Sequence, residues 1–113
     1  MNPSTIPRGN ILGNWVLAVT LSPASVAWTT TTEQTFTVTG LNVGDFVDVI
    51  KPTAQPGLGL ANCRVSAANT LAVTFQNVST ATITPTAAEV YQVSVTRPEN
   101  LTSSSVSNLT QIT

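Results

Sequence analysis

The chain has 113 residues, the size of one domain, and nine of them carry a charge: four Lys or Arg and five Asp or Glu. Charged residues make up 8% of the chain, against about a quarter in an ordinary globular protein. Four cations and a net charge of −1 exclude the phosphate neutralisation on which nucleic-acid binding depends. Histidine is absent and Cys63 is the only cysteine, which removes the usual general base, an internal disulfide and a thiolate zinc site. We therefore expect a structural or binding module with no cofactor, no metal and no enzymatic activity.

We expect no targeting signal in the first residues of the sequence. Residues 1–8 contain two prolines and one cation, and the apolar stretch 11–21 is interrupted by Gly13, Asn14 and Thr20. That stretch is too short and too polar for a membrane-spanning helix, and no cleavage site follows it. We expect a chain that is neither exported through a signal peptide nor inserted in a membrane.

Alternation of apolar and polar residues predicts β-strands along the middle of the chain. In chain order the candidate strands cover residues 15–21, 34–39, 45–51, 58–65, 71–75, 80–84 and 89–96. The segments 34–39, 71–75 and 89–96 have the clearest period of two, whereas 58–65 and 80–84 have the weakest. The residues predicted to point inward are Leu71, Val73, Phe75, Tyr91, Val93 and Val95. In three other segments the alternation separates two faces: Phe36 and Val38 from threonines, Trp15, Leu17 and Val19 from Val16, Ala18 and Thr20, and Val47 and Val49 from Phe46, Asp48 and Ile50.

Turn-forming residues separate these strands at the spacing of sandwiches and barrels. Residues 66–69 and 76–79 both resemble hairpin connections. The pattern predicts an all-β fold, an antiparallel two-sheet β-sandwich with an immunoglobulin-like outline and about seven strands. A small closed barrel is the alternative architecture. We expect the sandwich to cover residues 15–97, between an N-terminal arm (1–14) and a C-terminal arm (98–113).

Few side chains are candidates for chemistry. Asp45 and Asp48 form the only close acidic pair. Because side chains alternate along a strand, these two residues would point to opposite sides, which suits neither calcium binding nor acid–base catalysis. We interpret both as turn-capping or surface residues. Cys63 lies next to Arg64 but has no histidine or second thiol to act as its base, so we interpret it as a half-buried strand residue.

The two tryptophans suggest different roles. Core tryptophan is common in sandwiches, and a structural role is expected for one of the two. Trp28 precedes a run of threonines near a predicted sheet edge, where a large exposed aromatic residue suits a subunit contact. Outward strand positions are mostly Thr, Ser, Gln and Asn rather than Lys or Glu, a composition that fits a surface covered by neighbouring subunits.

Two stretches resemble a small β-sandwich module found in structural proteins of tailed bacteriophages. In residues 37–49, a Gly-Leu-x-x-Gly-Asp turn (residues 40–45) enters a valine-rich strand. In residues 64–77, a Val-Ser-Ala-Ala-Asn-Thr hairpin (residues 65–70) enters a strand that ends in Phe-x-Asn. The resemblance covers about residues 20–97, and a free-standing module of this size is most similar to a capsid decoration (cement) protein.

This resemblance implies a virion protein on the outer surface of the capsid, made in the host cytoplasm. Its expected partners are the major capsid protein and other copies of itself, in a homotrimer, with no nucleic acid and no membrane. We expect apolar residues of the two arms, together with Trp28, to contact the capsid or neighbouring subunits. The predicted contact residues are Ile6, Ile11, Leu12, Trp28, Leu101, Val106, Leu109 and Ile112.

Two other functions fit the composition. The first is a tail fibre or baseplate component that recognises host carbohydrate, with Trp28 or Tyr91 as a stacking platform. The second is a bacterial cytoplasmic adaptor, which would usually carry more surface charge. The number of copies in each virion distinguishes the first alternative from a decoration protein.

Overall fold

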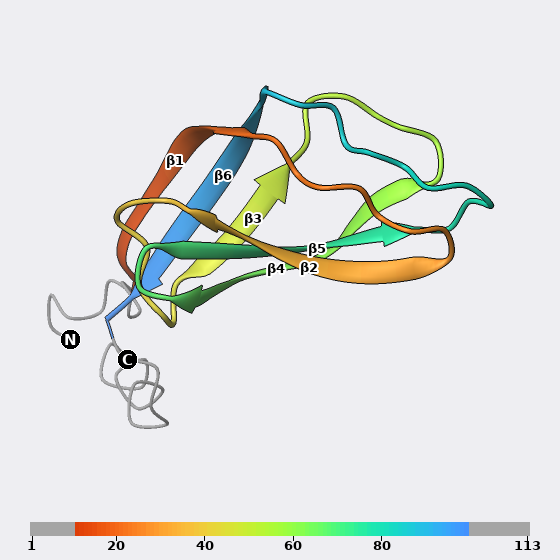
Figure 1. Cartoon of the computed structure of the whole chain (residues 1–113). Helices are drawn as coiled ribbons and strands as arrows, with labels where there is room; N and C mark the ends of the chain where they lie inside the picture. The colour runs from red at the N-terminus through yellow and green to blue at the C-terminus, as the bar shows by residue number, and fades with distance from the viewer. Residues whose placement is uncertain (1–10, 100–113) are drawn as a thin grey trace, which may run out of the picture.

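The computed structural model describes residues 11–99, and every regular element in this range is a β-strand. In chain order the strands are β1 (Ile11–Leu21), β2 (Thr30–Thr37), β3 (Phe46–Ile50), β4 (Leu58–Ala67), β5 (Thr70–Asn77) and β6 (Glu89–Pro98) (Figure 1). The β-branched and aromatic residues in these segments fit a pleated, half-buried surface. The all-β prediction is confirmed. Within residues 11–99 no helix is present that could cross a membrane.

The strands form two antiparallel sheets of three strands each, in the orders β1-β6-β3 and β2-β5-β4. Figure 1 shows the strands of one sheet running across those of the other. The chain changes sheet at every connection except the β4–β5 hairpin. Because no strand pair joins the two sheets, the fold is the predicted two-sheet sandwich and the closed-barrel alternative is wrong.

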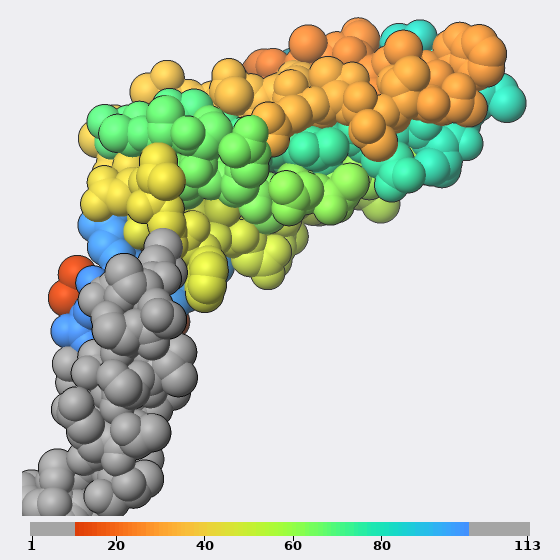
Figure 2. Space-filling model, turned by 90° about the horizontal axis from the view of Figure 1, so that it is seen from below, coloured from red at the N-terminus to blue at the C-terminus, as the bar shows by residue number. Residues whose placement is uncertain are grey.

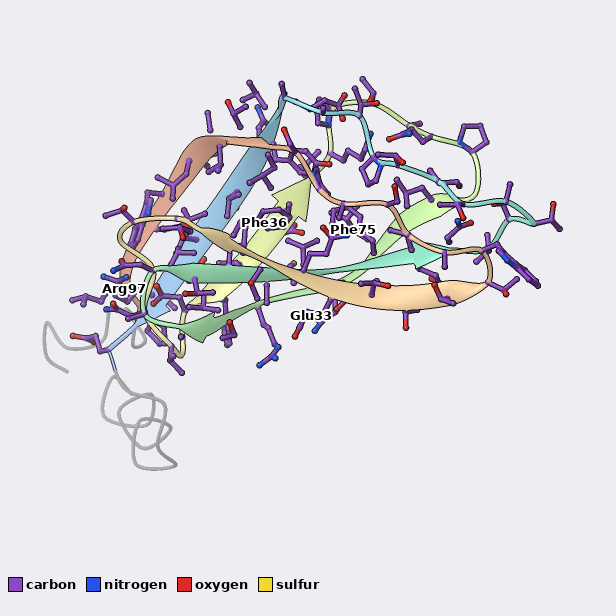
Figure 3. The ribbon with its side chains drawn as sticks, in the orientation of Figure 1. Glu33, Phe36, Phe75 and Arg97 are labelled. Carbon is purple, nitrogen blue, oxygen red and sulfur yellow. The ribbon has the colours of Figure 1, made fainter. Side chains whose placement is uncertain are left out.

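The core lies between the sheets and is centred on their middle strands. Leu71, Val73 and Phe75 of β5 are fully buried, as are Tyr91 and the two following inward valines of β6. Phe36 and Phe75 lie between the two sheets (Figure 3). Burying each large apolar side chain contributes about 1.5–3 kcal/mol, so this one cluster stabilises both sheets. The predicted inward faces of the strands are confirmed.

The two sides of the sandwich differ in how closely the sheets approach. On one side the edge strands β3 and β4 contact each other, whereas β1 and β2 have no comparable contact on the other. The inward residues Trp15, Leu17 and Val19 of β1 pack against the core but remain partly exposed. The sandwich is therefore closed along β3 and β4 and open to solvent along β1 and β2.

Residues 78–88 do not form the strand and hairpin that their sequence suggests. Of the segment 80–84, only Ile83 makes a bridge, to Val26, so residues 11–99 form six strands rather than about seven. Residues 76–79 begin a crossing to the other sheet instead of a hairpin. The reason is Asn77, whose buried amide donates to the carbonyls of Val26 (3.0 Å) and Ala81 (2.9 Å). These side-chain bonds replace the ladder that a strand would need.

The ordered sandwich is slightly longer than the predicted domain. β1 begins at Ile11, so residues 11–14, which the sequence assigns to the N-terminal arm, belong to the first strand. At the other end β6 continues to Pro98, and Ile11 pairs with Pro98. The remaining residues of both predicted arms lie outside the described range.

Candidate interaction surface

The outer side of the β1-β6-β3 sheet carries only one ionisable residue, Asp48. Side chains alternate between the two faces of a strand, so each strand presents every second residue outward. We call this surface the neutral face. Its residues are Asn14, Val16, Ala18 and Thr20 of β1, Val90, Gln92, Ser94 and Thr96 of β6, and Phe46, Asp48 and Ile50 of β3.

Four large apolar side chains of the neutral face are open to solvent. The exposed fractions are 68% for Val16, 64% for Phe46, 56% for Ile50 and 50% for Val90. Between the two edge strands, β6 contributes hydroxyl and amide side chains at residues 92–96. The face can therefore bury apolar area and exchange neutral hydrogen bonds, with almost no cost of removing ions from water.

An ion pair between the buried Asp45 and the partly exposed Arg97 fixes the end of the sandwich where β6 finishes and β3 begins. Arg97 Nε donates to Asp45 Oδ1 (2.9 Å), and Nη2 donates to Asp45 Oδ2 (2.8 Å) and to the Gly40 carbonyl (2.7 Å). The guanidinium also lies over the Trp15 ring, 5.0 Å from its centre. Hydrogen bonding to Arg97 lowers the pKa of Asp45, against the opposing effect of burial. This cluster is a structural clamp, and Asp45 and Arg97 also line an open hollow together with residues 42–44, 98 and 99.

The two stretches that resemble the phage module meet beside this clamp. Gly40 N–H donates to Asn69 Oδ1 (2.8 Å), Asn69 N–H donates to the Leu41 carbonyl (2.8 Å) and Val38 N–H donates to the Asn69 carbonyl (2.9 Å). Asn69 and Gly40 both have positive φ, 59° and 102°, which asparagine and glycine tolerate best. These motif residues form the corner that joins the β4–β5 hairpin to the loop before β3.

Asp45 and Asp48 point to opposite sides, as their spacing predicts. Asp45 is buried and also accepts the Asn42 N–H (2.9 Å), which makes it a turn cap, whereas Asp48 is exposed on the neutral face. Sequence reasoning missed the partner, Arg97, because 52 residues separate the pair. Among residues 11–99, no three His, Cys, Asp or Glu side chains lie close enough to hold a metal ion.

A second ion pair closes the opposite end of β6. Lys51 Nζ lies 2.9 Å from Glu89 Oε1 and donates to Thr53, whose hydroxyl in turn donates to Glu89 Oε2. The hydrogen bond from Thr53, followed by that from Lys51, lowers the pKa of Glu89. Burial, helped by Glu89, raises the pKa of Tyr91 to about 12. Because Tyr91 is fully buried, its suggested role as a carbohydrate-stacking platform is wrong.

Cys63 is the half-buried strand residue that the sequence predicts. Its Sγ donates to the Val47 carbonyl across the closed side of the sandwich (3.3 Å). Burial raises the pKa of the thiol, so it is less nucleophilic than a free cysteine at neutral pH.

The predicted contact residues are spread over the molecule. Ile11 and Leu12 are 45% and 65% exposed at the start of β1, whereas Trp28 is 57% exposed in the turn before β2. Figure 1 places these two regions at opposite ends of the sandwich. Trp15 packs against the core, which gives it the structural role expected for one tryptophan. Five other predicted contact residues lie outside the described range: Ile6, Leu101, Val106, Leu109 and Ile112.

A shallow hollow lies next to Trp28. Thr29, Thr30 and Thr31 line it on one side, and Gln76, Asn77 and Val78 line it on the other. The Asn77 amide is already used inside the protein, since its Oδ1 accepts from the Ser79 N–H (2.9 Å) and its Nδ2 donates to two carbonyls. The Thr29 and Thr30 hydroxyls donate to the carbonyls of Trp28 (2.8 Å) and Ala27 (2.7 Å). The Thr31 hydroxyl and the Gln76 amide are therefore the donors that remain for a ligand.

The four exposed apolar residues of the neutral face are not among the contact residues predicted from the sequence. The sequence does contain a sign of this surface. Val16, Phe46 and Ile50 are apolar residues at strand positions that face solvent, where polar residues are normal. Comparisons with protein-family models, curated proteins and solved structures found no match to this chain.

Proposed function

We propose that the chain is a non-enzymatic structural protein of a tailed-bacteriophage virion, which decorates the capsid and stabilises it by binding across neighbouring major capsid protein subunits. The observation that carries this proposal is the neutral face, where Val16, Phe46, Ile50 and Val90 are half or more exposed on one side of a sheet. The motif resemblance of residues 37–49 and 64–77 supports the choice of a phage partner.

Stabilisation would arise from surface burial rather than from chemistry. Each 100 Å² of apolar surface removed from water contributes about 2.5 kcal/mol before the costs of association. A neutral surface adds little charge-desolvation cost, so a small area per copy is sufficient when many copies bind one shell. One copy that covers parts of two capsid subunits links them, and the links together oppose the outward pressure of packaged DNA.

The proposal is tested with virions of a phage that encodes this chain, purified with and without the protein. Virions that lack it should release their DNA at a lower temperature, and adding back the purified full-length chain should restore the original release temperature. Quantification should find hundreds of copies per virion. Equal heat survival with and without the protein would contradict capsid stabilisation.

Carbohydrate recognition in a tail fibre or baseplate is the second candidate. The observation that favours it is the exposed Trp28 beside a hollow lined by Thr29, Thr30, Thr31 and Gln76. An aromatic ring beside neutral hydroxyl and amide groups is a suitable surface for a sugar. This function predicts only a handful of copies per virion and loss of binding to host-surface polysaccharide in Trp28→Ala.

A further inference from the structure

The four edge strands of the two sheets are not equally protected against pairing with another chain. β3 has five residues and is covered by β4, with the Cys63 thiol bonded to its Val47 carbonyl. β4 carries Arg64 and two register irregularities, and β2 carries Glu33. Short length, cover, bulges and charged residues are the usual means of preventing unwanted strand pairing.

β1 has almost none of these protections. It is the longest strand, with eleven residues from Ile11 to Leu21, and contains no charged residue and no proline. Its single irregularity lies at the beginning, between Ile11 and Gly13. Apart from the ladder with β6, no backbone group of β1 is hydrogen-bonded to another residue of the described range. Among residues 11–99, nothing pairs with the second edge of this strand.

The open side of the sandwich also leaves apolar area uncovered beside this edge. Trp15, Leu17 and Val19 of β1 lie opposite Val95, Val93 and Tyr91 of β6, respectively. The three β6 residues are fully buried, whereas the three β1 residues remain partly exposed. A strand added next to β1 would cover this area as well as the free backbone groups.

We propose that β1 pairs antiparallel with the β1 strand of a second copy of this chain. Because β1 has no charge, two identical strands meet no like charges in any register, so no charge repulsion opposes the pairing of two copies. A two-fold axis then joins the two β1-β6-β3 sheets into one six-stranded sheet. The two neutral faces become one continuous surface. This inference does not depend on the proposed virion function.

The mass of the full-length chain in solution tests the proposal. Sedimentation velocity between about 1 and 100 µM should show conversion from monomer to dimer. Hydrogen exchange should show that β1 amides become protected as the dimer forms. A chain that stays monomeric throughout this range would overturn the proposal, and so would a trimer, the assembly that the phage resemblance implies.

A matched pair of variants locates the contact. Val16→Lys and Phe46→Lys replace neutral-face residues of similar exposure, 68% and 64%, on β1 and on β3. Val16→Lys should raise the dimer dissociation constant at least about tenfold, because a charge on an edge strand opposes pairing, whereas Phe46→Lys should leave it unchanged. Equal effects of the two changes, or no effect of Val16→Lys, would overturn pairing through β1. Ala18→Lys provides a second β1 variant if Val16→Lys does not fold.

Discussion

The two outer faces of the sandwich differ in how they are adapted to water. The outer face of the β2-β5-β4 sheet, part of which is seen in Figure 2, carries threonines and an ion pair. Arg64 on β4 donates two hydrogen bonds to Glu33 on β2, at 2.8 and 2.9 Å, and so reaches across the middle strand β5. In Figure 3, Glu33 points away from the other sheet. The neutral face has no such pair and exposes large apolar residues instead.

Ala72 shows that the Arg64–Glu33 ion pair covers apolar surface on the outer face of the β2-β5-β4 sheet. Ala72 lies on the outward phase of β5, between Thr35 and Arg64 on the neighbouring strands, and yet it is fully buried. The long Arg64 side chain that reaches Glu33 shields it, in the way that charged residues cover apolar surface while keeping their heads in water. On the neutral face no side chain covers Phe46 or Ile50 in this way. Such a surface is suited to being covered by a partner.

The largest expected effect comes from comparing two phenylalanines. Phe75 is fully buried in the core, whereas Phe46 is 64% exposed on the neutral face. Phe75→Ala should lower the free energy of unfolding by about 4 kcal/mol, because it leaves a cavity. Phe46→Ala should change it by less than about 0.5 kcal/mol. Urea denaturation of both variants measures the difference. A large loss for Phe46→Ala would show that this residue serves the fold rather than a partner.

A smaller effect on the free energy of unfolding is expected from changing Asp45, whose buried carboxylate lies away from the neutral face. Asp45→Asn should lower the free energy of unfolding at pH 7 by about 2 kcal/mol, because Arg97 loses its charged partner. The matched control is Asp48→Asn, which removes the same charge from the exposed neutral face and should have little effect on stability at pH 7. Equal losses in the two variants would contradict the clamp.

The Asp45–Arg97 ion pair also makes the free energy of unfolding depend on pH. Hydrogen bonding to Arg97 lowers the pKa of Asp45 in the folded protein below its ordinary value of 3.8. A lowered pKa means that the ion pair contributes its full stability above the unfolded-state pKa and loses it as the pH falls through the folded-state value. The unfolding free energy should therefore fall below about pH 4. The fall should be smaller in Asp45→Asn, measured by urea denaturation at pH 7 and pH 3.

Local patterns were sufficient to predict most of the fold. The period of two correctly placed Val47 and Val49 on one face of β3 and Phe46, Asp48 and Ile50 on the other, because side-chain alternation is a property of the strand itself. Which of the two faces is buried depends on how the sheets pack. The segment 80–84 also alternates, but the buried Asn77 amide holds the preceding loop through side-chain bonds. The local sequence pattern cannot predict this effect, because Asn77 bonds to Val26, which is 51 residues away in the sequence.

The candidate surface was harder to predict for a related reason. The shortage of charge indicated a covered surface, but which residues share a face depends on how strands 30 to 80 residues apart are paired. Val16 and Asp48 lie in one row only because β6 separates β1 from β3 and places Ser94 between them. The contact between Asp45 and Arg97 also depends on strand pairing, because the two residues are 52 positions apart in the sequence.

Binding to capsids that lack the protein tests the central claim most directly. The double variant Ile50→Lys with Val90→Lys places two charges on the neutral face, and Thr35→Lys with Thr37→Lys places two on the outer face of the other sheet. The first variant should bind at least about 100-fold more weakly than the wild type in co-sedimentation, and the second should bind normally. The account would be contradicted if the Ile50→Lys, Val90→Lys variant bound capsids as tightly as the wild type while the Thr35→Lys, Thr37→Lys variant bound them more weakly.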